Sequence, residues 1–272
     1  MEVGDGKGDD HIRCHKCPHR AVIHQRYSGM LLCREHFQED VQRKAREYLR
    51  QTGLFGRSRR IMIELDGERN SCALAYILKN TFHSRRDIDI QAVTIDEGGS
   101  DAHYSRCAKS MADRLDIPLH HWTMSLPPDL IASSAGLSAR KRKALFCAAR
   151  KEDAGIIATG EDLDEEALAI FLRYLKGECS NDRAGEEEMH WIKPLRRIPK
   201  REVRLYALIL GLGSDRIAAP CRDRLQEEAG RLLSEFDCRH PGTNYSLLRG
   251  WERLAKSGGH RQGAKPLSKD IE

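Results

Sequence analysis

The sequence predicts an α/β protein with a doubly wound parallel sheet and a small N-terminal zinc module. Short apolar runs that read as buried strands alternate with segments of helical periodicity, and this order is typical of a parallel sheet covered by helices. Two cysteine- and histidine-containing pairs precede the first apolar run. We therefore expect three regions: a zinc-binding module at 11–37, an α/β domain with C-terminal helices at 38–255, and a disordered tail at 256–272.

Composition limits the classes of protein to consider. Of the 272 residues 40% are hydrophobic and 32% are charged, and no apolar run approaches the roughly 18 residues that a membrane span needs. The polar start MEVGDGKGDD lacks the apolar core of a signal peptide, so we expect a cytoplasmic protein without a membrane partner. The net charge of +5 is compatible with an RNA partner but does not require one.

Two ligand pairs near the start predict a metal site. Cys14-x-x-Cys17 is followed after fifteen residues by Cys33-x-x-His36. Two such pairs at this separation match the spacing of a structural Cys₃His zinc module. The alternative is a set of unrelated thiols and a surface histidine, which the paired spacing disfavours. Because four protein ligands would fill the coordination sphere of Zn²⁺, the predicted site is structural and not catalytic.

The first strand of the sheet is predicted at 61–65, after an amphipathic helix at 35–54. A loop, DGERNS, follows the strand and leads into an apolar helix over 72–78. A strand, a glycine-containing turn and a helix can direct backbone N–H groups and a helix N-terminus at phosphate. Gly67 is the single glycine of this loop, so an ordinary connection between a strand and a helix is an equally good interpretation.

The middle of the chain continues the alternation. A strand at 88–95, a helix at 100–115 and a short strand at 118–122 are predicted, after which the pattern dissolves until 143. The basic run at 140–143 is either a solvated helix face or a patch for a polyanion. A helix at 146–150 leads to the next strand.

The segment 156–177 combines a buried strand, a tight acidic loop and an amphipathic helix. The strand at 156–158 is followed by Thr159 and Gly160, then by carboxylates that favour the first turn of a helix, and Gly177 lies where a helix would end. One interpretation is a well-capped surface helix. In the other, Asp164 holds Mg²⁺ or a water molecule beside a nucleotide, because the carboxyl ends of parallel strands form binding crevices.

The remaining segments read as a short strand, a basic turn and three helices. The helices are expected at about 200–210, 225–236 and after 241. Between 193 and 204 six basic side chains form a second candidate surface for a polyanion, and an ordinary solvated charged face is the alternative. These six are Lys193, Arg196, Arg197, Lys200, Arg201 and Arg204.

Several phrases of the chain, taken together and in order, resemble the PP-loop ATPase family. Within that family the chain is similar to the archaeal and bacterial tRNA 2-thiolation enzymes. The phrases are CHKC with CREH, AVTIDEG, ATGEDLDEEA, IKPLRRIPKREVRLYA and PGTNYSLLR, and the resemblance extends over roughly residues 11–255.

The resemblance implies an activity and a set of site residues. It implies that ATP with Mg²⁺ binds after the first strand and adenylates the C2 oxygen of a tRNA uridine, after which sulfur displaces AMP. Backbone N–H groups and Mg²⁺ would stabilise the charge that develops on the phosphate oxygens. The implied nucleotide-binding residues are Gly67, Ser71, Thr159 and Gly160, and the implied catalytic residues are Asp164, Lys141 and Cys221.

The chain departs from the family pattern where the chemistry would take place. The family's SGGxDS falls on 66–71, of which Gly67 and Ser71 remain. Glu68 replaces a glycine and Asp66 adds a second negative charge, so we predict a weakened affinity for ATP.

The expected iron–sulfur ligands also differ. Ser134 and Leu137 occupy the positions of the cluster-binding CxxC, and Cys221 alone stands where a third cluster cysteine or a sulfur carrier would be. A single thiolate does not make a complete [4Fe–4S] ligand set. No CxxC pair follows Cys221, so the family's second zinc module is missing.

These observations leave three hypotheses. The first is an ATP-dependent tRNA sulfurtransferase with a degenerate phosphate loop. It would receive sulfur from a sulfur-carrier protein and would form a homodimer. The second is a non-catalytic tRNA-binding or scaffolding relative that serves an intact paralogue. The third is an interaction protein built on the zinc module with no role on RNA.

Overall fold

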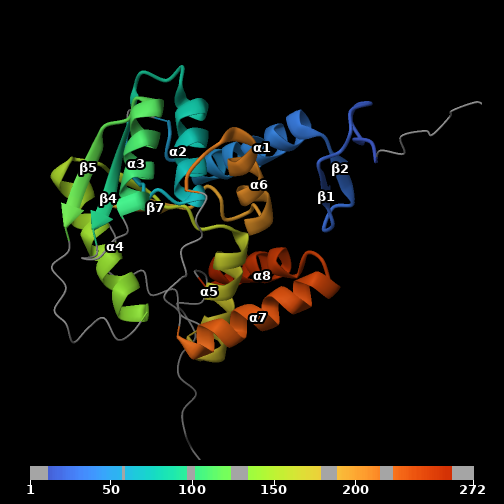
Figure 1. Cartoon of the computed structure of the whole chain (residues 1–272). Helices are drawn as coiled ribbons and strands as arrows, with labels where there is room; N and C mark the ends of the chain where they lie inside the picture. Colours follow the sequence, from blue (N-terminus) through green and yellow to red (C-terminus); the bar gives the residue numbers. More distant parts are fainter. Residues whose placement is uncertain are drawn as a thin grey trace, which may run out of the picture.

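The central feature of the fold is a parallel sheet of five strands in the order β5-β4-β3-β6-β7 (Figure 1). The protein is described from a computed structural model, which describes residues 12–56, 59–96, 102–123, 134–178, 189–214 and 223–258. The strands are β3 (Arg59–Glu64), β4 (Ile88–Asp96), β5 (Leu119–Thr123), β6 (Ile156–Ala158) and β7 (His190–Ile192). The predicted doubly wound α/β class is therefore confirmed.

The order of the strands reverses beside β3. From β3 the chain moves outward to β4 and β5 on one side, and it then returns to place β6 and β7 on the other. Ile61 pairs with Ile90 of β4 and with Ile156 of β6. At such a reversal the connections after the two central strands diverge to opposite faces, which leaves a crevice at the carboxyl ends of the strands.

Helices cover both faces of the sheet. α2 (Arg69–Phe82) and α3 (Ala102–Leu115) lie on one face, with α1 (Arg34–Thr52) and α6 (Lys200–Leu210) behind them, and α4 (Ser134–Lys151) lies on the other (Figure 1). Alternate strand residues point to opposite faces. Ile61 and Ile63 thus join the larger cluster under α2, whereas Met62 packs under α4.

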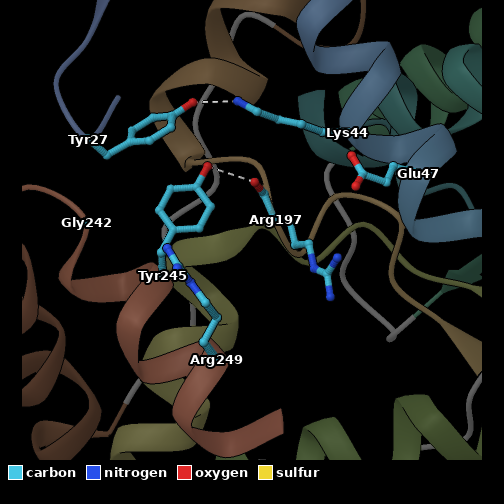
Figure 2. A pocket seen from close by; sticks show the side chains of 7 residues that line it. All are labelled: Tyr27, Lys44, Glu47, Arg197, Gly242, Tyr245 and Arg249. Atoms are coloured by element: carbon cyan, nitrogen blue, oxygen red, sulfur yellow. Dashed lines mark hydrogen bonds between the residues drawn. The ribbon is translucent and has the colours of Figure 1, made fainter. Parts of the chain in front are cut away.

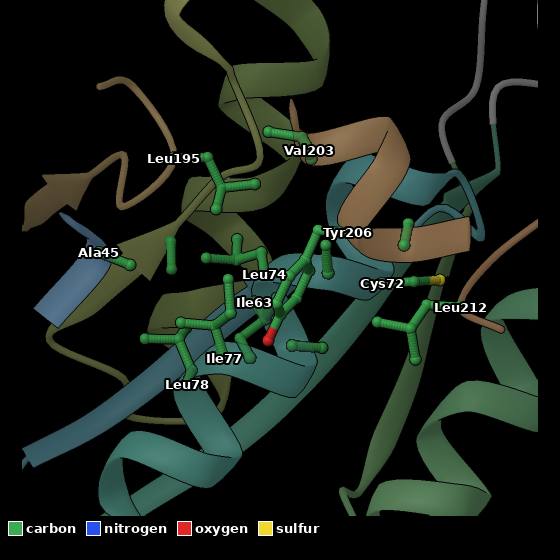
Figure 3. Close-up of a cluster of buried hydrophobic side chains, with 14 of the residues drawn as sticks. Ala45, Ile63, Cys72, Leu74, Ile77, Leu78, Leu195, Val203, Tyr206 and Leu212 are labelled. Atoms are coloured by element: carbon green, nitrogen blue, oxygen red, sulfur yellow. The ribbon is translucent and has the colours of Figure 1, made fainter. Parts of the chain in front are cut away.

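The larger cluster binds distant parts of the chain into one core. Tyr206 of α6 is fully buried among side chains from β3 and α2, and Ala45 brings α1 into the same cluster (Figure 3). Cys14, Leu32 and Cys33 of the N-terminal segment belong to it as well. The segment with the hairpin β1 (Ile23–Gln25) and β2 (Met30–Leu32) is therefore packed directly against the α/β core.

Three helices form a separate group beside the sheet. α5 (Leu163–Leu175) packs against α7 (Arg224–Arg239) and α8 (Thr243–Gly258) (Figure 1). Leu163 and Ile170 form a small core with Leu248 there. Gly177 lies just beyond the end of α5 at φ +70°, a conformation that glycine adopts without steric cost, as its position in the sequence predicts.

Two boundaries differ from those expected. α4 begins at Ser134, although the periodicity of the sequence breaks down before 143, because alanine, leucine, arginine and lysine supply helix propensity where few apolar side chains mark a face. The division proposed at residue 37 falls inside α1. The tail predicted at 256–272 lies outside the described residues from 259 onward, and none of the described helices is long and apolar enough to cross a membrane.

Candidate functional site

A pocket of about 580 Å³ opens where the order of the strands reverses. It lies between the loop that follows β3, the loop that follows β6, and the side of α4. The sequence-predicted residues Ser71, Lys141, Thr159 and Gly160 line it. The structure thus brings together both loops that the resemblance assigns to a nucleotide. The other lining residues are Glu64, Asp66, Glu68, Asn70, Ala139, Arg142, Leu145, Glu161, Glu165 and Trp191.

The carboxylate of Asp66 accepts hydrogen bonds from two donors in the loop after β3. Its Oδ1 accepts a hydrogen bond from the backbone N–H of Glu68 at 2.9 Å and another from Oγ of Ser71 at 2.5 Å. An N–H and a hydroxyl at the start of a helix are the groups that would otherwise bind a phosphate oxygen. In this chain an internal anion already takes that position.

Gly67 is required by packing as well as by the turn. It adopts φ +87°, and a Cβ at this position would lie 2.1 Å from the carbonyl oxygen of Tyr104 in α3. The carbonyl of Gly67 also accepts a hydrogen bond from the N–H of Ser214 at 2.9 Å. The one glycine kept in the loop therefore fixes the position of the loop between α3 and the segment after α6.

The second loop is fastened to the first by Asn70. The Nδ2 of Asn70 donates to the carbonyl of Gly160 at 3.2 Å and to Oδ2 of Asp162 at 3.0 Å. Asp162, which is fully buried, accepts through Oδ1 from the N–H groups of Asp164 and Glu165 and so caps α5. A Cβ on Gly160 would lie 3.2 Å from Asn70, so the close approach of the two loops favours glycine there.

Asp164 faces away from this pocket. Its Oδ2 accepts a hydrogen bond from the backbone N–H of Lys200 at 2.7 Å, at the first turn of α6, and it is not among the lining residues. A carboxylate at this place satisfies one of the free N–H groups of the helix. The role in Mg²⁺ binding suggested by the sequence stays a prediction for Asp164.

The described residues that line the pocket carry an excess of negative charge. Five of its lining residues are acidic, and two, Lys141 and Arg142, are basic. The Nζ of Lys141 lies 2.5 Å from Oε1 of Glu64 and 4.0 Å from Oδ2 of Asp66, while Arg142 lies over the ring of Trp191 at 4.0 Å. Lys141 is thus held by the carboxylates at the end of β3.

Burial changes the protonation of several of these carboxyls. Burial raises the pKa of Glu64 to about 7, although the ammonium of Lys141 opposes this change. Burial, followed by the neighbouring Asp162, raises the pKa of Glu165 to about 8. Burial and Asp66 together raise the pKa of Glu68. Carboxyls gathered in a confined place resist ionisation because each charge is poorly hydrated and repels the others.

The four predicted metal ligands converge near the N-terminus. Their ligand atoms all lie within 4.8 Å of one another. Sγ of Cys17 is 3.6 Å from Sγ of Cys33, and Nδ1 of His36 is 3.5 Å from Sγ of Cys14 and 3.3 Å from Sγ of Cys33. Metal bonds of about 2.0–2.3 Å arranged as a tetrahedron place ligands about 3.3–3.8 Å apart, so this set fits one tetrahedral ion.

Three of the six basic residues at 193–204 form ion pairs within the fold. Lys193 and Arg196 both pair with Glu166 of α5, at 2.5 and 3.0 Å, and Arg197 pairs with Glu252 of α8 at 3.2 Å. Arg201 donates to the backbone carbonyl of His24. The run that looks like a polyanion surface in the sequence therefore joins α5, α8 and the N-terminal hairpin to the turn before α6.

The cysteines outside the metal site differ in exposure. Cys72 is buried, as its apolar helix predicts. The apolar helix pattern around Cys147 predicts a buried side chain as well, and this prediction is wrong: Cys147 is exposed because Ala144, Leu145 and Ala148 form the buried face of α4. Cys221 lies outside the described residues, so its predicted role stays a prediction.

Comparison with known proteins identifies relatives over most of the chain. Residues 13–38 match the family described as 2-thiouridine synthetase TtuA, N-terminal LIM domain. The tRNA 2-thiolation protein NcsA of Haloferax volcanii is 28% identical over 90% of this chain and 87% of its own length. The tRNA-5-methyluridine(54) 2-sulfurtransferase of Pyrococcus horikoshii is 26% identical over 90% of this chain and 83% of its own. The chain is thus similar, over most of its length, to PP-loop proteins of tRNA 2-thiolation.

A solved structure extends this relation to the fold. The U34-tRNA thiolase NcsA from Methanococcus maripaludis, determined with its [4Fe–4S] cluster, superimposes with a TM-score of 0.81 over 96% of this chain and 94% of that one, at 23% identity. At this identity the superposition shows that the two chains share a fold.

Sequence reasoning missed several residues of the pocket. Asn70 stood in the loop without an assigned role, and the contact that joins the loops becomes visible only when β3 and β6 are paired. Glu64 lies inside the predicted strand at 61–65 and has no predicted role. The available signal was its place near the carboxyl end of that strand, where a side chain can turn into the crevice.

Proposed function

We propose that the protein works in tRNA 2-thiolation as a tRNA-binding family member whose own phosphate loop does not take ATP. The support for a tRNA partner is the relation to tRNA 2-thiolation proteins over most of the chain. The support for a closed phosphate loop is the hydrogen bonding of Asp66 to Ser71 and to the N–H of Glu68. In this proposal an intact paralogue carries out the adenylation and the sulfur transfer.

The contact of Asp66 is the observation that carries the proposal. A triphosphate would have to displace the Asp66 carboxylate from its two donors and then lie beside Glu64 and Glu68. Like charges brought together in a partly dry site cost several kcal/mol. The single lysine of the pocket, Lys141, is drawn toward Glu64 and would have to leave it to reach a phosphate.

Titration calorimetry with ATP and Mg²⁺ tests the closed loop. We expect no saturable heat for the wild-type protein up to millimolar nucleotide. The double variant Asp66→Ser, Glu68→Gly frees both donors and removes two charges, so it should gain at least roughly tenfold in affinity, about 1.4 kcal/mol. Asp113→Ser, which removes an exposed carboxylate of α3 outside the pocket, is the matched control and should gain nothing.

Two results would contradict this part of the proposal. Wild-type binding of ATP in the micromolar range would mean that the nucleotide displaces Asp66 readily. Failure of the double variant to gain affinity, with its circular dichroism unchanged, would mean that Asp66 and Glu68 are not what excludes the nucleotide.

Retention of tRNA is the second arm of the test. Unfractionated tRNA should bind the wild-type protein at low ionic strength and dissociate steeply as salt is added, because binding releases counterions from the phosphates. Deletion of the gene should lower the 2-thiouridine content of tRNA. Rescue of that content by a Cys221→Ala variant would favour the non-catalytic role, and loss of rescue would favour an enzyme.

A second candidate function is an ATP-dependent tRNA sulfurtransferase. The observation that favours it is the pocket itself, since Ser71, Lys141, Thr159 and Gly160 still surround a volume of about 580 Å³ at the ends of the central strands. Under this candidate the predicted roles of Asp164, Lys141 and Cys221 apply, with Mg²⁺ and a sulfur-carrier protein as further requirements. Micromolar ATP binding by the wild type would select it.

For the N-terminal site we propose Zn²⁺ in a structural role. Cys14, Cys17, Cys33 and His36 supply three soft thiolates and an imidazole at tetrahedral separations, which is the donor set that zinc prefers. We keep residues 11–37 as the zinc-binding module, 38–255 as the α/β domain and a homodimer as part of the proposal. The cytoplasm is the proposed compartment, as the name Cytoplasmic tRNA 2-thiolation protein 1 of a 26% identical Caenorhabditis elegans relative suggests.

A further inference from the structure

A second hollow, of about 310 Å³, lies away from the ends of the strands (Figure 2). It is formed where the turn between β1 and β2, helix α1, the segment before α6 and helix α8 meet. Its lining includes Tyr27, Lys44, Glu47, Arg197, Tyr245 and Arg249, none of which lines the pocket at the strand ends. Neither the resemblance nor the proposed function assigns these residues a role.

Two aromatic rings form a fixed wall of this hollow. The rings of Tyr27 and Tyr245 lie side by side with centroids 4.7 Å apart and planes tilted by 46° (Figure 2). The hydroxyl of Tyr245 donates to the carbonyl of Arg197 at 2.9 Å, and Nζ of Lys44 donates to the hydroxyl of Tyr27 at 2.5 Å. Because both hydroxyls are engaged, the rings are held in place, and both residues line the hollow.

Most charges around the hollow are neutralised by neighbours. Lys44 pairs with Asp40 at 2.7 Å and with Glu202 at 3.1 Å, and Arg197 pairs with Glu252 at 3.2 Å. Glu47 lies 3.3 Å from Arg43 on the same helix. The positive and negative groups on three sides of the hollow are therefore already compensated.

Arg249 is the exception. It is exposed, and no hydrogen bond or ion pair joins it to any residue in the described part of the chain. It follows Tyr245 by four positions on α8, so the two side chains are neighbours on one face of the helix. The hollow thus combines two fixed aromatic rings with one uncompensated guanidinium.

We propose that this hollow binds a single nucleotide of tRNA, with the base against the tyrosine rings and a phosphate on Arg249. This inference rests on the proposed tRNA-binding function and gives it a location. Aromatic rings stack on unpaired bases, each contact contributing roughly 1–3 kcal/mol, and arginine pairs with phosphate. The volume lies at the lower end of ligand pockets, which run from roughly 300 to 1,000 Å³, and suits one nucleotide.

The location also suits an RNA with structure of its own. The hollow lies between the N-terminal hairpin and the C-terminal helices, at a distance in sequence from the loops at 66–71 and 159–162. An unpaired nucleotide from a loop or an end of the tRNA is the kind of base that can be inserted, because paired bases are stacked and inaccessible.

Titration of the full-length protein with unfractionated tRNA at several salt concentrations tests the inference. Arg249→Ala should weaken binding about five- to tenfold at low salt and reduce the slope of log affinity against log salt by about one, since one phosphate contact is lost. Arg249→Lys should keep the slope. Arg231→Ala, the loss of an exposed arginine of α7 outside the hollow, should change affinity by less than about twofold.

A direct readout accompanies the affinities. Ultraviolet irradiation of the wild-type complex, followed by mass spectrometry of digested protein, should place a cross-linked nucleotide on Tyr245 or Tyr27. Equal affinity and slope for wild type and Arg249→Ala, or cross-links confined to other parts of the chain, would overturn the hollow as a nucleotide site while tRNA binding itself stands. Absence of any tRNA retention by the wild type would overturn both this inference and the proposed function.

Discussion

Glu64 and Asp66 show, at the scale of single residues, how acidic side chains at the end of a strand can bind the donors that an anion would otherwise bind. Asp66 accepts from Ser71, and Glu64 holds Lys141. A replacement of glycine by Glu68 in the same loop adds a third carboxylate. The consequence is a pocket in which carboxyls compete with one another for ionisation, and this competition is measurable.

The stability of the wild-type protein should fall as pH rises from about 4.5 to about 7 through the contribution of Glu64. In the unfolded chain this carboxyl loses its proton near its ordinary pKa of 4.5, whereas in the folded protein its pKa is about 7. The folded state therefore holds an extra proton in this interval. The contribution of Glu64 to the free energy of unfolding is highest below pH 4.5, falls as pH rises, and is at its lowest above pH 7. Glu64→Gln removes the titration, so the variant should gain on the order of 2 kcal/mol relative to wild type between pH 5 and pH 8.

Urea unfolding of both proteins at pH 5 and pH 8 measures this difference. An identical change of the free energy of unfolding with pH in wild type and variant would show that Glu64 ionises normally in the folded protein.

At the scale of elements, α5 depends on its first residues. Asp162 accepts from two N–H groups of the helix, the side chain of Glu165 reaches back to the N–H of Asp162 at 3.3 Å, and Asn70 adds a contact from α2. The cap thus connects α5 to the first turn of α2. This explains why the acidic segment is buried against the pocket, although the sequence is also compatible with the start of a surface helix.

Asp162→Ala should destabilise the protein by about 1–3 kcal/mol, because it removes a buried cap and leaves Asn70 without one of its acceptors. Asp223→Ala removes the cap of α7, whose residue is exposed, and should cost less, about 0.5–1 kcal/mol. Thermal or urea unfolding of the two variants provides the comparison. A larger loss for the exposed cap would contradict the importance assigned to the connection between α5 and α2.

At the scale of the whole molecule, the N-terminal metal site is joined to the core by a buried polar network. Gln25 of β1 donates to Asp40 of α1 at 2.8 Å and to Glu202 of α6 at 3.1 Å, and Lys44 neutralises both carboxylates. Cys14 and Cys33 belong to the same hydrophobic cluster as the sheet. Loss of the metal should therefore lower the stability of the entire protein and not of the hairpin alone.

Removal of the metal with a chelator should lower the melting temperature of the entire protein by about 5–10 °C, the shift that corresponds to a loss of about 3 kcal/mol. Addition of Zn²⁺ should restore it, and a Cys33→Ser variant should show the low value from the start. Differential scanning fluorimetry measures all three. An unchanged melting temperature after complete removal of the metal would mean that the site does not stabilise the core.

Much of the architecture could be predicted because local patterns and tertiary structure agree. The strands at 61–65 and 156–158 are mostly apolar on both faces, as strands covered by helices must be, and the strand at 88–95 is apolar on one face along its length; each is found. The metal ligands could be predicted because their spacing is itself geometric. α4 was placed too late because its helical face is short of apolar residues, and Cys147 was misplaced for the same reason.

By itself the sequence determined the α/β class, the converging metal ligands and the acidic character of the phosphate loop, since these depend on periodicity, spacing and charge within short segments. Only the tertiary structure decided which charged side chains form ion pairs and which do not. Lys193, Arg196 and Arg197 read as an RNA surface in the sequence, yet they are neutralised by Glu166 and Glu252 from other helices. Arg249, to which the sequence assigns no role, has no partner among the described residues and lies beside two tyrosines. The physical reason is that the field around a charge depends on neighbours in space, and the fold brings those neighbours from segments far along the chain.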